Sequence, residues 1–237
     1  VSKLQKEDSE IIQISEYVVK KGIERLDKEG SFGYLKSALP SLIVLLLSFV
    51  IDVAYVPLFG HVANSFSEWL FPGSPPLNTA IEPVQLWWMP ILAYILFIFF
   101  AYRSNSALRQ EILNKGASEN IIDKVIEKYS GMIDSIGTAL PLLGAGILLV
   151  SIKIGPQLFL GFSVPFEIKS IIVLAIAKLF DAVFEAQSLR FQKIVEEVKN
   201  VETEYYYQNR IDMQNQLISK LAEENKKSMT DIVMASS

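Results

Sequence analysis

Long charge-free runs alternate with charged segments along this chain. The residues from Pro83 to Tyr102 form one such run, and those from Ser135 to Ile152 form another. A charge-free stretch of roughly 18 or more residues is long enough to cross a hydrocarbon layer about 30 Å thick as an α-helix. Two such runs in a chain of 237 residues predict an all-α membrane protein.

Two weaker apolar segments raise the predicted number of membrane-spanning helices to four. One precedes Pro83 and is interrupted by Asp52; the other begins near Lys169 and contains three charged residues. The predicted regions are an amphipathic helix over 1–36, the first two spans over 37–102 (the first over 37–59) with an extracytoplasmic loop over 60–83, a helical segment over 103–132, the third and fourth spans over 133–187, and a C-terminal helix and tail over 188–237.

The distribution of Lys and Arg predicts the orientation. Residues 1–36 carry seven, residues 103–132 carry five and residues 188–237 carry seven, whereas 60–83 and 155–168 carry none. Because basic residues are retained on the cytoplasmic side during insertion, we expect both ends inside. The N-terminal segment contains no apolar signal-peptide core, so insertion is expected through the internal helices. The predicted location is a bacterial inner membrane.

The polar segments 103–132 and 188–237 are also predicted to be helical. Gly116 divides the middle segment into two predicted helices, with Ser118 as the N-cap of the second. In the tail, apolar residues recur every three or four positions, for example Ile194, Val198 and Val201. This spacing predicts a helix continuing from the fourth span, with an apolar stripe available for self-association.

The amino-acid composition limits the kinds of catalytic and metal-binding site that the chain can form. The chain has no cysteine and a single histidine, His61, which excludes disulfides and thiolate metal sites and disfavours a histidine-rich one. Its net charge of −4 argues against a nucleic-acid partner. No nucleophile–base set, metal-ligand spacing or phosphate-binding glycine loop is present. The sequence therefore predicts a protein that is not an enzyme and carries no cofactor.

The charges inside the predicted spans are the candidate functional residues. Lys178, Asp181 and Glu185 are spaced three and four residues apart and share one helix face. Lys178 and Asp181 are expected to pair, because an isolated charge in the bilayer costs at least roughly 2.5–3.5 kcal/mol. Two interpretations of these three residues are open. Either Lys178 and Asp181 form a structural pair and Glu185 is solvated, or the three form a polar seam that lines an ion path or contacts a partner helix. Asp52, in the outer half of the first span, is either a structural cap or a solvated residue near Pro57, or else an ion-binding residue that belongs to the ion path or partner contact.

The third span is rich in small residues. In lipid, small side chains let helix backbones approach and pack. The predicted helix-packing residues are Gly137, Pro141, Gly144 and Ala145.

The run Ile136-Gly-Thr-Ala-Leu-Pro-Leu-Leu-Gly144 resembles the threonine-alanine-proline-leucine-leucine-glycine run of the MotA/TolQ/ExbB superfamily of ion-driven motor stators. The resemblance covers roughly residues 118–200 and includes a last span that continues as an inner helix. It implies Thr138 and Ser151 as further candidates for an ion path or partner contact. In the last span, Lys178 and Asp181 stand where that superfamily has a polar threonine.

The resemblance implies a homopentamer in the lipid bilayer, surrounding a single-span partner whose intramembrane aspartate carries the ion. Ion flow would then be coupled to mechanical work. Two other functions stay open from the residues themselves. One is a small ion channel or ion-coupled transporter, and the other is a non-conducting membrane scaffold.

The predicted topology can be tested by single-cysteine labelling in intact cells. Cysteines at Asn64 and Gln157 should react from outside, whereas those at Asn114 and Asn215 should react only after permeabilisation. If a cysteine at position 215 reacts from outside, either the fourth span or the assigned orientation is wrong.

Overall fold

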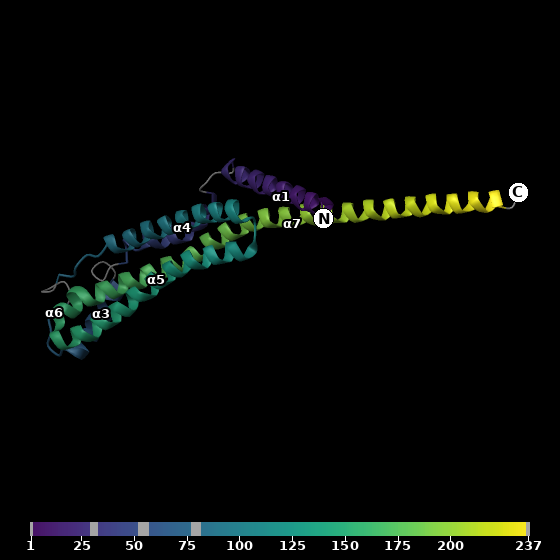
Figure 1. Cartoon of the computed structure of the whole chain (residues 1–237). Coiled ribbons are helices and arrows are strands. Elements are labelled where there is room, and N and C mark those ends of the chain that lie inside the picture. The colour runs from purple at the N-terminus through teal and green to yellow at the C-terminus, as the bar shows by residue number, and fades with distance from the viewer. Residues whose placement is uncertain (1, 29–32, 52–56, 77–81, 236–237) are drawn as a thin grey trace.

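The computed structural model describes residues 2–28, 33–51, 57–76 and 82–235 of the chain. Within these ranges every regular element is helical, and the long helices form an elongated bundle (Figure 1). The prediction of an all-α fold is therefore confirmed. Asp52, the acid predicted inside the first span, lies outside the described residues.

The helices differ greatly in length, and α7 is much the longest, with 72 residues. In chain order they are α1 (Ser2–Lys28), the 3-10 helix η1 (Gly33–Ala38), α2 (Leu39–Leu47), α3 (Pro57–Leu70), α4 (Trp88–Lys115), α5 (Glu119–Ile154), α6 (Pro156–Leu158), the π-helical turn η2 (Phe159–Ser163) and α7 (Val164–Ala235).

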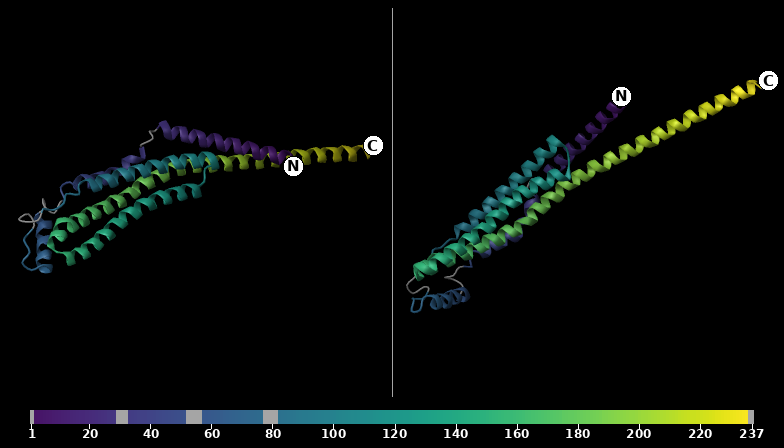
Figure 2. Two further views of the ribbon diagram at one scale, coloured as in Figure 1. Left: turned by 60° about the vertical axis from the view of Figure 1, so that its left-hand side comes forward. Right: turned by 60° about the horizontal axis from the view of Figure 1, so that its bottom comes forward.

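The two ends of the bundle are different. Both views in Figure 2 show α7 continuing far beyond the other helices toward the C-terminus, with α3 at the opposite extreme. We call the end that contains α3, α6 and η2 the loop end, and the end from which α7 projects the tail end. Residues 211–226 of the projecting part are exposed on every side.

The tightest unit is the antiparallel pair of α5 and α7. The chain reverses at Gly155, whose φ of 134° lies in a region that other residues rarely adopt. At the tail end, Gly116 with φ 84° closes α4 in the same way, and α5 then begins after Ser118. Ser118 is the N-cap residue of α5 as predicted, although its side chain makes no capping hydrogen bond.

Three helices are long and apolar enough to cross a membrane. They are α4, α5 and the continuous helical stretch from Pro156 through α7. A bent pair, residues 11–28 of α1 with residues 33–47, becomes a fourth candidate when it is counted as one span. The described residues thus hold three or four candidate spans, where the sequence predicted four.

The prediction that residues 37–59 form one helix is wrong. Helix α2 ends at Leu47, turns follow at residues 48–50, and a separate helix, α3, begins at Pro57. Proline suits the first helical position because no N–H is needed there. Helix α3 also occupies part of 60–83, which was expected to be only a turn-rich loop.

The start of the fourth span also differs from the prediction. The stretch 155–168 was expected to be an extracytoplasmic connection, with the span beginning near Lys169. Instead, helical structure begins directly after Gly155 and continues through α6 and η2 into α7. The apolar residues of this stretch therefore belong to the span, and every charge in α7 lies further along it than the sequence suggested.

Two large buried clusters hold the bundle together, and a smaller third one packs α3 against η2 at the loop end. The larger joins η1, α2, α4, α5 and α7, with Phe180 of α7 in edge-to-face contact with Tyr94 and Phe97 of α4 at centroid distances of 5.5 and 5.6 Å. The second joins α1 to the tail-end parts of α4, α5 and α7 through residues including Val19 and Ile23. Helix α1 therefore packs on its own protein, beside the polar halves of the long helices.

The contact between α5 and α7 depends on Gly137. A Cβ added there would lie 2.6 Å from the Cβ of Ala177, which cannot move without the backbone. Gly146 on the same helix has nothing within 4 Å of the corresponding position. Gly137 is thus a close-packing position within the chain, whereas Gly146 faces outward.

We predict that Gly137→Ala destabilises the protein, because overpacking costs about 1–3 kcal/mol and outweighs the gain in helix propensity. Gly146→Ala is the matched control and should be neutral or slightly stabilising. The measurement is thermal unfolding in a mild detergent. Equal behaviour of the two variants would contradict the packing of α5 on α7.

Candidate intramembrane polar site

Lys169 is a buried charged residue in the middle of the bundle. It belongs to α7 and is only 3% exposed. Its ammonium group donates hydrogen bonds to the carbonyl oxygens of Ser48 and Ile51, at 2.6 and 2.8 Å. Both acceptors belong to the segment that follows the end of α2.

These contacts satisfy backbone carbonyl groups of the turn that follows α2. The last carbonyl groups of α2 itself accept hydrogen bonds from the N–H groups of residues 48–51, so the next carbonyl groups along the chain are those that need a donor. In water they would be solvated, but in a hydrocarbon layer each needs a donor from the protein, and the helix dipole places negative charge at this end of α2. The Lys169 ammonium supplies both hydrogen bonds and a positive charge where α2 stops.

Glu167, two residues before Lys169, lies against α5. A Cβ added to Gly144 would overlap the Glu167 carboxyl group, so this carboxyl fills the space that the missing side chain leaves. Phe166 borders the same space, with a ring carbon 3.3 Å from the Cβ position. The carboxyl oxygen Oε2 is buried and has no hydrogen-bond partner in the described part of the chain.

Glu167 and Lys169 therefore serve different helices. Residues two apart on an α-helix point roughly 200° apart, so they do not face each other. Lys169 reaches the end of α2, and Glu167 reaches the backbone of α5. Together they form the intramembrane polar site, which we define as Glu167, Lys169, Gly144 and the carbonyl groups of Ser48 and Ile51.

The depth of this site follows from α5. Gly144 lies near the centre of the charge-free run between Asp134 and Lys153. Along the other helix, Glu167 is roughly 16 Å from Pro156, about half the thickness of a hydrocarbon layer. Both estimates place the polar site near the middle of the apolar region.

The predicted charged seam has a different place and a different pairing. Lys178 donates to Asp134 of α5 at 2.6 Å, rather than pairing with Asp181. Asp134 immediately precedes the charge-free run of α5, and the Lys178 and Asp134 side chains are 53% and 40% exposed. Because the span begins at Pro156, Lys178 lies roughly 33 Å along it, at the tail-end boundary rather than at mid-depth.

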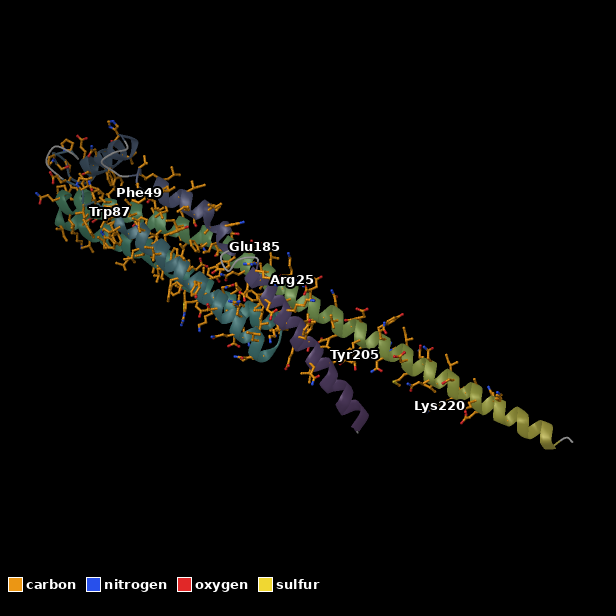
Figure 3. All side chains as sticks on the ribbon, turned by 90° about the horizontal axis from the view of Figure 1, so that it is seen from above. Arg25, Phe49, Trp87, Glu185, Tyr205 and Lys220 are labelled. Atoms are coloured by element: carbon orange, nitrogen blue, oxygen red, sulfur yellow. The ribbon has the colours of Figure 1, made fainter. Side chains whose placement is uncertain are left out.

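Asp181 and Glu185 continue along α7 from Lys178, and both are exposed. Asp181 interacts electrostatically with Asp134 and Lys178. Figure 3 places Glu185 within the bundle, near Arg25 of α1, and α7 stays packed against the other helices as far as Val198. The three charges thus follow one another out of the apolar region.

The remaining predicted site residues lie on α5. The Thr138 hydroxyl is exposed and donates to the carbonyl oxygen of Asp134 at 2.7 Å. Ser151 is buried and its hydroxyl donates to Leu148. Among the predicted packing residues, Gly137 and Gly144 face α7, Pro141 is half-buried and Ala145 is exposed. The structure brings none of Thr138, Ser151 and Glu185 to the polar site.

No family model, curated protein or solved structure matches the chain. Its function is therefore inferred from its own residues and geometry.

Glu167 and Lys169 were missed as site residues for one reason. Lys169 was taken as the boundary of the fourth span, which left Glu167 outside it. The signal was the apolar run from Ile154 to Phe166, which is interrupted by no charge and which, joined to the following segment, gives a full span.

Replacing Lys169 tests the role of its ammonium group. Lys169→Met should destabilise the protein, since each lost hydrogen bond from a charged donor costs about 1.5–3 kcal/mol and strands a carbonyl group. Lys178→Met is the matched control on the same helix and should have little effect, because its ion pair is exposed. Unfolding in detergent at low and high salt is the measurement.

The effect of salt on stability also distinguishes the contacts of Lys169 from the ion pair of Lys178. The exposed Lys178–Asp134 pair should weaken as salt screens it, whereas the buried Lys169 contacts should not change. If Lys169→Met unfolds like the wild type, the ammonium group does not hold the end of α2.

Proposed function

We propose that this chain is a helical membrane subunit of an ion-driven motor or energising complex, in which several copies surround a single-span partner. The observation that carries the proposal is the continuity of α7. One helix contains the intramembrane polar site and the boundary ion pair, and it extends without a break as the projecting tail. A continuous helix is a rigid connection between a charge-binding layer and a distant segment.

The outward face of α5 supports assembly with other chains. In its most apolar window only 17% of the residues are buried within the chain, against 56% in that of the span from Pro156. Gly146 and Ala145 are exposed on this face, and Gly146 has open space beside it. Small exposed residues on a spanning helix allow another helix to approach closely.

The resemblance of residues 118–200 to the MotA/TolQ/ExbB superfamily supports the choice of partner. It favours five copies and a single-span protein with an intramembrane aspartate.

The test is the mass of the complex extracted in mild detergent from its own membrane. We expect several copies of this chain together with a small single-span protein. A monomer would contradict the proposal. Copies without a partner that conduct ions in vesicles would indicate a channel, and copies without either property would indicate a scaffold.

Two substitutions of different size at Gly146 test the assembly and provide its control. Gly146→Leu should dissociate the complex, because the bulky side chain separates neighbouring helices, while Gly146→Ala should leave it assembled. Both variants should keep the unfolding behaviour of the isolated chain, because the position is open within it.

A further inference from the structure

Among the described acidic residues, Glu167 alone has a buried carboxyl oxygen, Oε2, without a hydrogen bond. It also lacks an ion pair, whereas five other described acids each face a lysine or arginine: Asp27, Glu111, Glu119, Asp134 and Glu197. Glu167 nevertheless lies beside the centre of the charge-free run of α5.

The surroundings of Glu167 contain few charges. Helix α5 has no titratable or charged residue between Asp134 and Lys153, and α2, α6 and η2 have none at all. On α7 the neighbouring cation is Lys169, which points to the other side of the helix and contacts the carbonyl groups of Ser48 and Ile51. Glu167 is half-buried: its oxygen Oε2 lies buried against the backbone of Gly144 and the ring of Phe166, and the Ser170 hydroxyl is the polar group beside the carboxyl.

A carboxyl group in such a position exists in two forms with very different requirements. The ionised form needs a counter-charge or several donors, because an uncompensated charge in hydrocarbon is strongly unfavourable. The protonated form is neutral and needs no counter-charge. The geometry accommodates the protonated form and leaves the ionised form to arise when water or a counter-charge arrives.

We propose that Glu167 is a reversible proton-binding site in the middle of the membrane-spanning bundle. In the release step the carboxyl O–H bond breaks, the proton passes to water, and the electron pair stays on the carboxylate. Proton binding at Glu167 would identify the ion of the proposed complex and the group that binds it. Only the coupling of this proton to mechanical work rests on the proposed function.

The site fits a proton better than a metal cation. Hard cations require several oxygen ligands around one point. No group of three or more acidic, histidine or cysteine side chains comes together in the searched part of the chain, and Oε2 of Glu167 has no polar neighbour within hydrogen-bonding distance. Gly144 provides the space in which the carboxyl is held, and therefore acts as a positioning residue.

The test uses dicyclohexylcarbodiimide, an apolar reagent that adds to protonated carboxyl groups within membranes. Native membranes containing the full chain are labelled over a range of pH, and the modified peptide is identified by mass spectrometry. We expect Glu167 to be labelled, with a rate that falls about tenfold for each pH unit beyond its midpoint, as for any single carboxyl. A water-soluble carbodiimide should instead label the exposed Glu185 and leave Glu167 unmodified.

Two variants identify the reacting group. Glu167→Gln, close in size and neutral, should lose the label, while Glu185→Gln should keep it on Glu167. The pH profile of the wild type requires no variant and holds even if Glu167→Gln fails to fold.

Three results would overturn the proposal. They are the absence of Glu167 labelling at every pH, a labelling rate that does not change with pH, and protection by sodium at constant pH, which would make the ligand a sodium ion. Because labelling requires neither a partner nor an oligomer, this proposal and the proposed function can fail separately.

Discussion

The structure depends on how a helix can stop inside a hydrocarbon layer. Helix α2 ends at Leu47, and the carbonyl groups beyond it would be left without donors among apolar neighbours. The Lys169 ammonium group meets the carbonyls of Ser48 and Ile51 and so couples the position of α2 to that of α7. With this contact in place, α2, α4 and α7 can pack around Phe180 as one core.

The same contact explains why a charge is retained at mid-depth. A buried lysine is costly unless its hydrogen bonds are satisfied, and here two of its three donors meet backbone carbonyls directly. Glu167 lies one side-chain layer away on the opposite face of α7 and rests on Gly144. The ammonium group of Lys169 and the carboxyl group of Glu167 are thus kept apart by the helix that carries both, and each contacts a different neighbour.

The sequence predicted the elements whose signals are local. The charge-free runs gave α4 and α5, Gly116 and Ser118 gave the turn between them, and the periodic apolar residues gave the long helix of the tail. The predicted bounds of the first span were wrong because the residue that stabilises the end of this helix, Lys169, is far away in the sequence. The local sequence stays apolar past Leu47 and therefore resembles that of a helix that continues. The pairing of Lys178 with Asp134 was missed for the same reason: 44 residues separate them, and only the packing of α5 on α7 brings them together.

The length of α7 has a mechanical consequence. From Lys169 to Lys226 the helix extends for roughly 86 Å at about 1.5 Å per residue. A tilt of only about 5° about the polar site would displace the far end by roughly 7 Å, as with a lever turning on a fulcrum. A rearrangement too small to disturb the packing around Phe180 would therefore be amplified into a movement comparable to the width of a helix.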